Sequence, residues 1–314
     1  MITFGPVPSR RLGYSLGINH IPPKHCTYAC VYCQVGQTTT MEITRREFYP
    51  VAQIVNEVEQ AITRAAEFGR TIDFLTLVPD GEPTLDLNLG ILIRELKKFL
   101  IPVAVITNSS LIDRPDVQDE LMLADWVSVK VDTLEENSWR KINRPHHSLS
   151  LIAILNGILS FRQKFTGELV TETMLVSGIN DNENTIRMLT GFLTELQPFK
   201  SYLSIPTRPP VESWVRPPDA ETLQLLLEVI ERRCTFFDLL FESEGDDFVS
   251  TGNLVEDILG ITAVHPLRES ALRKLVEEVD GDWNLIESLI MTEQLFRLTY
   301  RGDHFYTRRS SQRV

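Results

Sequence analysis

Short apolar runs and amphipathic stretches alternate along most of the chain. Apolar residues recur at helical spacing between residues 51 and 68, which predicts a helix that ends at Gly69. The run Ile72–Val78 is short and almost continuously apolar, as expected of a buried strand. The same reasoning predicts further strands at 102–107, 126–132, 169–176, 201–205 and 236–241, and helices at 87–99, 113–123, 148–165, 183–196 and 219–232.

Strands that are regularly separated by helices predict an α/β fold with a parallel sheet. With a first strand at Ser15–Ile21, the pattern gives about six β/α units before the chain changes character. A partial barrel, a complete eight-unit barrel and an open doubly wound sheet share this periodicity, so the pattern leaves all three open. In each of them, functional groups gather at the carboxyl ends of the strands.

The C-terminal part reads as a separate small unit. A polar, acidic break at Ser243–Asp247 divides the chain into expected domains 1–242 and 243–314. Short helices are expected near 253–259, 266–278 and 282–291, followed by a hairpin around Arg301–Asp303. Helices followed by a hairpin resemble a winged-helix unit. Residues 251–314 include ten acidic and eight basic residues, the latter partly in a tail of Arg308, Arg309 and Arg313, which favours partner docking over tight DNA binding.

Composition and charge narrow the class of protein. The 314 residues are 43% hydrophobic and 24% charged, which is typical of a globular protein. The formal net charge of −12 disfavours strong non-specific binding to nucleic acid. The N-terminus lacks a signal-peptide pattern, and the most apolar stretch, near 149–159, is too short to span a membrane. A cytoplasmic protein is therefore expected.

Three cysteines in one short segment carry the clearest chemistry. Cys26, Cys30 and Cys33 have a C-x3-C-x2-C spacing, which can place three thiolates on one iron–sulfur cluster. Electron-transfer clusters of the four-iron type normally have four cysteine ligands. A four-iron cluster with three protein ligands keeps one iron open to bind another molecule, which indicates a catalytic cluster.

Other uses of these cysteines fit less well. A disulfide is disfavoured in a chain without an export signal. A structural zinc site needs four ligands, and His25, the one candidate for the fourth, directly precedes Cys26 and is poorly placed to converge with it. The fourth cysteine, Cys234, is expected to pack as a small apolar residue. One spare cysteine cannot hold a second cluster, so one cluster is predicted.

Cys26, Cys30 and Cys33, with aromatic Tyr32 before the last cysteine, resemble the signature of the radical S-adenosylmethionine (SAM) superfamily. The resemblance implies a [4Fe–4S] cluster whose open iron is chelated by the amino and carboxylate groups of SAM. One electron then cleaves SAM to methionine and a 5′-deoxyadenosyl radical, which abstracts hydrogen from a substrate. It also implies that Tyr32 lies against the adenine, and that the fold is a partial (β/α)6 TIM-like barrel.

Candidate SAM-binding residues follow three of the predicted strands. Gly81-Glu82-Pro83 could simply form a turn, but it resembles the family segment that binds the SAM amino group through backbone and carboxylate acceptors. Asn108 could cap a helix or approach SAM. Alternation directs Lys130 into the lumen, where it could pair with Asp132 or contact the SAM carboxylate or ribose.

Three further segments have weaker signals. Glu172 is a minor candidate for the lumen. The basic stretches Ser9–Gly13 and Lys141–His147 could approach the mouth of the barrel and bind a phosphate or carboxylate, or could be solvated surface. No general acid or base for the substrate is identifiable.

The opening segment from Gly5 to Arg11, the segment Cys33–Gly36 and the C-terminal unit together resemble a branch of the superfamily near the wyosine-forming tRNA-modification enzymes. The expected function is a radical SAM enzyme that modifies RNA or a protein, with flavodoxin or ferredoxin as electron donor. Two alternatives remain: a non-enzymatic [4Fe–4S] redox sensor with a winged-helix docking or DNA-binding unit, and a zinc-stabilised docking protein. Formation of 5′-deoxyadenosine separates the first hypothesis from both.

Overall fold

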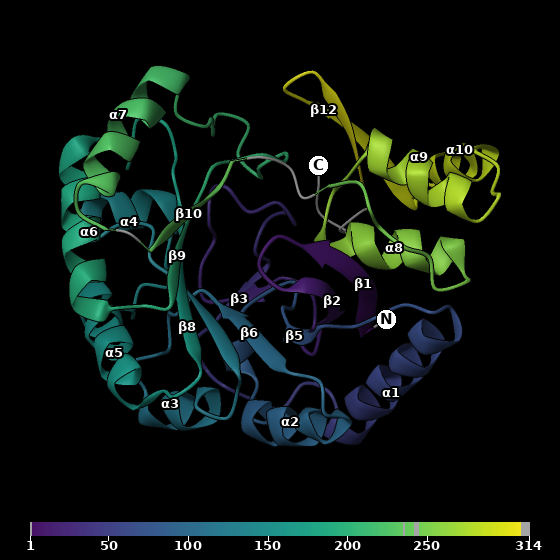
Figure 1. Cartoon of the computed structure of the whole chain (residues 1–314), viewed down its shortest axis with the longest axis horizontal. Helices are drawn as coiled ribbons and strands as arrows, with labels where there is room; N and C mark the ends of the chain where they lie inside the picture. Colours follow the sequence, from purple (N-terminus) through teal and green to yellow (C-terminus); the bar gives the residue numbers. More distant parts are fainter. Residues whose placement is uncertain (1, 235, 242–244, 309–314) are drawn as a thin grey trace.

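A curled, open sheet of eight strands forms the larger part of the molecule (Figure 1). The computed structural model describes residues 2–234, 236–241 and 245–308. The strand order is β1-β2-β5-β6-β7-β8-β9-β10, with every pair parallel except β1 with β2. The strands are β1 (Thr3–Ser9), β2 (Gly13–Ile18), β5 (Phe74–Leu77), β6 (Val103–Thr107), β7 (Trp126–Lys130), β8 (Glu168–Met174), β9 (Lys200–Ser204) and β10 (Phe237–Leu240).

Helices between the strands form an arc outside the sheet (Figure 1). They are α1 (Val51–Glu67), α2 (Leu89–Leu96), α3 (Pro115–Leu121), α4 (Glu136–Ile142), α5 (Leu151–Lys164), α6 (Glu183–Leu196) and α7 (Ala220–Glu231). The main core lies between these helices and the outward-facing residues of the strands, such as Leu77, Val105 and Val127. The predicted partial barrel is confirmed, because the sheet remains open between β1 and β10 and the helices lie along one side of it.

The inward face of the sheet has its own small apolar cluster. Ala104, Trp126, Val170 and Tyr202 meet in the lumen around Leu12, which lies in the turn between β1 and β2. This turn joins the amino end of β2, so it enters the lumen from the side opposite the expected active site. The Leu12 side chain therefore fills the lumen at that end of the half-barrel.

Strand β1 and helix α4 were not predicted from the sequence pattern. Strand β1 contains Pro6 and Pro8, which argue against a central strand but are tolerated here because β1 lies at the edge of the sheet. Helix α4 is only seven residues long and follows β7 before the predicted helix α5. The predicted strand at 15–21 is shifted, since β2 covers Gly13–Ile18.

The C-terminal part folds as three helices and a three-stranded sheet. Its elements are α8 (Leu254–Val264), β11 (Leu267–Arg268), α9 (Glu269–Glu278), α10 (Asn284–Met291), β12 (Leu295–Tyr300) and β13 (Asp303–Arg308), with strand order β11-β13-β12. The predicted hairpin is confirmed: Arg301 and Gly302 both have positive φ, as a two-residue type I′ turn requires. The helix predicted at 253–259 extends further, to Val264.

This C-terminal unit packs directly on the half-barrel. Phe4 and Val7 of β1 join its apolar core, which is built around residues such as Ile261, Leu272 and Tyr306. Helix α8 lies beside β1 at the open side of the sheet (Figure 1). The predicted boundary at 242/243, Ser243 and Glu244 of the predicted polar break, and the basic residues Arg309 and Arg313 lie outside the described residues.

No helix among the described residues combines the length and the apolar character that crossing a membrane would require.

Candidate active site

The cysteine segment lies in the long connection between β2 and α1. Cys26, Cys30 and Cys33 are free thiols and half-buried. Main-chain hydrogen bonds tie the segment to residues 142–146, from Ala29 N to Asn143 O (3.0 Å), Val31 N to Ile142 O (2.9 Å) and His146 N to Thr27 O (2.9 Å). The segment after α4 therefore fixes the backbone that carries the three thiols.

Burial and mutual repulsion keep these thiols in the neutral form. Burial, and next the charge of Cys30, raises the pKa of Cys26 well above its usual range. Burial raises the pKa of Cys30 to about 12, and it also raises the pKa of Cys33. Three buried thiolates in one loop therefore need a compensating cation, as a metal centre provides.

Two side-chain amides approach the sulfur atoms. Asn108 Nδ2 lies 3.5 Å from Cys26 Sγ and 2.8 Å from Thr27 Oγ1. Asn143 Nδ2 lies 3.5 Å from Cys30 Sγ, 3.2 Å from Tyr32 Oη and 2.7 Å from Asp132 Oδ2. The predicted Asn108 is thus beside a predicted metal ligand. Asn143 was not predicted as a site residue. It stands in the basic stretch Lys141–His147, which was considered only for its positive charge.

The geometry disfavours a zinc site that uses His25. Its Nδ1 lies 2.6 Å from Glu42 Oε1 and 3.1 Å from Arg46 Nη2, and its ring packs edge-on against Phe48. Within the described ranges, no three Cys, His, Asp or Glu side chains are close enough to hold one metal ion. A four-iron cluster has a different requirement, since each of its thiolates binds a different iron.

The Gly81–Pro83 segment crosses the cysteine loop. Glu82 N donates to His25 O (3.0 Å), and a side chain at Gly81 would place its Cβ 2.1 Å from the same carbonyl oxygen. Only glycine fits this crossing. The crossing brings the carboxyl end of β5 against the first cysteine.

The Glu82 carboxylate is completely buried and fully bonded. Its Oε1 accepts from Thr84 N (3.0 Å), Thr84 Oγ1 (2.6 Å) and Thr107 Oγ1 (2.6 Å), and its Oε2 accepts from Asn108 N (2.8 Å). Burial nevertheless raises the pKa of Glu82. Four donors match the acceptor capacity of a carboxylate. Glu82 therefore joins the ends of β5 and β6.

Lys130 points into the lumen, as predicted. Its Nζ lies 3.1 Å from Glu172 Oε1 and 5.1 Å from the centre of the Tyr32 ring. Burial acts to lower the pKa of Lys130, but the charges of Glu172 and Asp132 outweigh it and the pKa lies above its ordinary value. The alternative pairing with Asp132 was wrong: Lys130 and Glu172 are neighbours in the register of β7 and β8.

Asp132 has a different role from the one predicted. It accepts hydrogen bonds from Tyr32 Oη, Asn143 Nδ2 and Met174 N, the last at 2.8 Å. It therefore links the cysteine segment to the carboxyl ends of β7 and β8.

A cavity of about 330 Å³ fills the lumen beside this site. Of the predicted site residues, Tyr32, Cys33 and Lys130 line it. The others are not among its lining residues: Cys26, Cys30, Gly81, Glu82, Pro83 and Asn108. Other lining residues come from the β1–β2 turn, strand β8, the segment after β9 and the end of α8; they include Arg10, Arg11, Glu172, Arg208, Val264 and His265. The predicted basic stretch Ser9–Gly13 thus enters the lumen rather than lying at its mouth.

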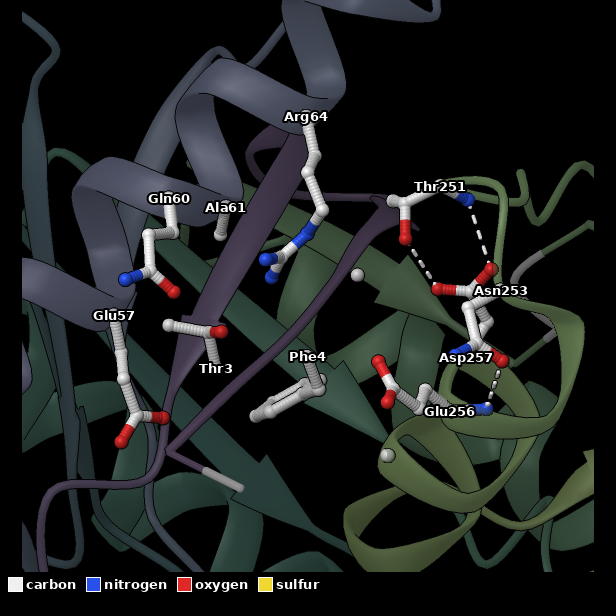
Figure 2. Close-up of a pocket in the computed structure, with 12 residues that line it drawn as sticks. Thr3, Phe4, Glu57, Gln60, Ala61, Arg64, Thr251, Asn253, Glu256 and Asp257 are labelled. Carbon is white, nitrogen blue, oxygen red and sulfur yellow. Dashed lines mark hydrogen bonds between the residues drawn. The ribbon is translucent and has the colours of Figure 1, made fainter.

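A second cavity, of about 430 Å³, lies between α1 and α8 (Figure 2). Figure 2 shows Arg64 of α1 and Glu256 of α8 on opposite sides of it, with Phe4 of β1 below Arg64 in this view. It contains none of the cysteines or SAM-binding residues predicted from the sequence. Of the two cavities, the lumen is therefore the one that predicted site residues line.

His20 contacts the Glu82–Pro83 segment, and its burial predicts that the stability of the fold depends on pH. It is fully buried, its Nε2 lies 3.3 Å from Pro83 O, and its Nδ1 has no partner among the described residues. Burial lowers the pKa of His20 from 6.5 to about 4, so the unfolded state binds more protons between these values. The contribution of His20 to the free energy of unfolding is complete above pH 6.5. It falls as the pH falls, by about 2 kcal/mol at pH 5. Urea unfolding of a His20→Leu variant should lack this loss; equal losses from pH 7 to 5 in both proteins would contradict the assignment.

Comparison with known proteins identifies the family. The family model described as "Radical SAM superfamily" matches residues 21–189. The chain belongs to the radical SAM superfamily. It is 45% identical over 314 residues to a UPF0026 protein of Methanocaldococcus jannaschii, covering 99% of this chain and 97% of that protein. A UPF0026 protein of Helicobacter pylori is 32% identical over 85% of both chains.

Solved structures share the radical SAM fold at low identity. A radical SAM methyltransferase from Sphaerobacter thermophilus superposes with a TM-score of 0.56 at 16% identity, over 72% of this chain and 66% of that one. TYW1 with a lysine–pyruvate adduct bound gives a TM-score of 0.54 at 16% identity, over 69% and 73%. The family resemblance predicted from the cysteine segment is therefore confirmed, and this radical SAM chain is an enzyme whose family implies a [4Fe–4S] cluster and SAM.

Proposed function

We propose that Cys26, Cys30 and Cys33 hold one [4Fe–4S] cluster, and that SAM binds beside it in the lumen. Such a cluster supplies the electron that cleaves SAM to methionine and a 5′-deoxyadenosyl radical, which abstracts hydrogen from the substrate. The observation that carries the proposal is that one loop, held by main-chain hydrogen bonds, carries three free thiols, and that Cys33 lines a 330 Å³ cavity. The donor set fits the cluster in its chemistry, because cysteine thiolates are the usual ligands of iron–sulfur clusters.

The surrounding residues have separate roles in this proposal. Asn108 and Asn143 donate toward the sulfur atoms of Cys26 and Cys30, a contact that tunes the potential of a cluster. Tyr32 offers a ring for the adenine. The backbone of Gly81–Pro83 binds the SAM amino group, and Lys130 binds the SAM carboxylate or ribose.

The C-terminal unit is proposed to be a docking domain. Its order of helix, strand, two helices and two strands, with β11 paired to β13, supports a winged-helix-like assignment. Domains of residues 1–242 and 243–314 are proposed accordingly. The partners would be RNA or a protein as substrate and a flavodoxin or ferredoxin as electron donor, in the cytoplasm.

Anaerobic reconstitution with iron and sulfide, followed by dithionite and SAM, tests the function. The expected product is 5′-deoxyadenosine, detected by mass spectrometry. If cleavage requires the substrate, SAM should still change the EPR spectrum of the reduced cluster, because it binds the open iron. A full cluster that neither cleaves SAM nor responds to it would favour the redox-sensor alternative, and zinc without sulfide would favour the docking protein.

A further inference from the structure

A lysine and an aspartate form a buried ion pair beside the cysteine loop. Lys24 lies two residues before Cys26, and Asp80 directly precedes Gly81. Lys24 Nζ lies 2.7 Å from Asp80 Oδ1, and the two side chains are 6% and 7% exposed. Both groups lose hydration on burial, and a pair of apolar residues in place of a buried ion pair often gives a fold that is as stable. Stability alone therefore does not explain this pair.

Contacts with the main chain fix the position of the Lys24 ammonium group. Lys24 N donates to Asp80 O (2.6 Å), and Lys24 O accepts from Thr40 N (3.1 Å). Its Nζ also donates to Val35 O, two residues after Cys33. The chain before the cysteines and the chain after them therefore meet at Lys24, and its charge lies at the end of the loop that carries Cys33.

The charges of the pair do not cancel at the Cys33 sulfur. Burial raises the pKa of Cys33, and the charge of Lys24 opposes this rise more strongly than the charge of Asp80 adds to it. The main-chain N–H groups of Val35 and Gly36 also favour the thiolate. The pair therefore acts on Cys33 as a dipole whose positive end is nearer to the sulfur.

A fixed cation beside one ligand changes the redox equilibrium of a cluster. Under the proposed function, Cys33 is a thiolate ligand, and reduction adds one negative charge to the cluster. The reduction potential of an iron–sulfur cluster depends on charge, on hydrogen bonds to its sulfur atoms and on exposure to solvent. A neighbouring cation attracts the reduced form more strongly than the oxidised form, because the reduced form is more negative. The cation therefore raises the potential.

We infer that Lys24, held in place by Asp80, is a positioning residue that raises the reduction potential of the cluster through Cys33. The inference rests on the proposed function and adds a residue outside the cysteine motif that makes the cluster easier to reduce. Asp80 orients the ammonium group but also opposes its charge. The two side chains therefore have opposite effects on the potential, although they belong to one ion pair.

Anaerobic redox titration of the reconstituted protein without SAM, followed by EPR of the reduced cluster, tests the inference. Lys24→Met removes the charge and keeps the apolar stem of the side chain. It should lower the equilibrium constant for reduction at least about tenfold, which is about 59 mV for one electron. Asp80→Asn removes the opposing charge, keeps an oxygen that accepts from Lys24, and should raise the potential. Opposite shifts indicate charge, because a loosened loop would shift both variants in the same direction.

Two further variants separate this charge from general effects. Lys98→Met removes the same charge from an exposed ion pair with Glu95 and should keep the wild-type potential. The double variant Lys24→Met, Asp80→Asn leaves no buried charge, so it serves as the test if Lys24→Met assembles no cluster, and its potential should also be lower.

Two results would overturn the inference. One is a full cluster with the wild-type potential in either variant that lacks Lys24. The other is a shift of the potential in the same direction in Lys24→Met and Asp80→Asn. Iron and sulfide per chain test the proposed function separately: a wild-type protein that assembles no cluster would overturn that function and the inference with it, whereas a full cluster with an unchanged potential would overturn the inference alone.

Discussion

Replacement of Cys30 by alanine is expected to remove the cluster and with it the formation of 5′-deoxyadenosine. Loss of an outer-shell partner of a metal site typically costs 10–100-fold, so loss of a ligand should reduce product at least about 100-fold. Cys30 is the middle thiol, and burial keeps its pKa near 12 in the absence of a metal. The measurement is iron and sulfide per chain after anaerobic reconstitution, together with product by mass spectrometry.

Cys234→Ala is the matched control for this variant. Cys234 is buried near Thr190 O (3.8 Å) and Thr194, between α6 and α7, and none of its recorded contacts involves the other three cysteines. This variant should keep its iron, its sulfide and its activity. Retention of a full cluster in Cys30→Ala, or an equal loss of iron in Cys234→Ala, would show that the three-cysteine segment is not the ligand set.

Periodic elements were predicted well because their signal is local. The amphipathic pattern gave the helix at 183–196 with the bounds of α6, and placed α1 within one residue. The cysteine spacing is equally local, which is why the family could be predicted from eight residues. Strand β1 was missed because its prolines argue against a central strand, and only its position at the edge of the sheet makes them acceptable.

The partners of the site residues depend on tertiary structure and were less predictable. Nothing in the sequence indicates that Glu82 will meet Thr107 and the Asn108 amide, 25 and 26 residues away. For Lys130 the sequence left a pair with Asp132 and a contact with SAM open, and the register of β7 and β8 places Glu172 beside it. The roles of Asn143 and Arg45 could not be predicted. For an asparagine or arginine between polar neighbours, the local sequence is the same whether the side chain is exposed or belongs to a buried hydrogen-bond network.

Arg45 is expected to be the most important side chain for the stability of the loop that carries Glu82. Its side chain is almost fully buried, and Nε and Nη2 donate to Thr84 O and Asp86 O, each at 2.8 Å. Nη1 pairs with Asp116 at 2.8 Å, and Nη2 also pairs with Glu120. Asp116 has its pKa lowered to about 2, by its hydrogen bond to Arg114 and also by Arg45. One guanidinium group therefore joins this loop to α3.

Arg45→Met keeps the apolar stem of this side chain but removes its donors. The free energy of unfolding should fall by about 3 kcal/mol, at the lower end of the cost of breaking a buried ion pair, because half-exposed Asp116 can recover water. The two carbonyl oxygens lose their donors as well, so the affinity for SAM should fall along with stability. Urea unfolding and SAM titration of the reconstituted protein measure the two effects.

The neighbouring Arg46 offers a control that differs mainly in burial. Its side chain is 48% exposed, pairs with Glu42 and lies over the Phe48 ring. Exposed ion pairs contribute about 1 kcal/mol or less to the free energy of unfolding. Arg46→Met should therefore lower this free energy by no more than that amount. Similar losses of unfolding free energy in both variants would mean that the buried Arg45 network stabilises the fold no more than an exposed ion pair does. A large loss confined to Arg45→Met would show that the Glu82 loop is held in place from outside the lumen, through α3, before any cofactor binds.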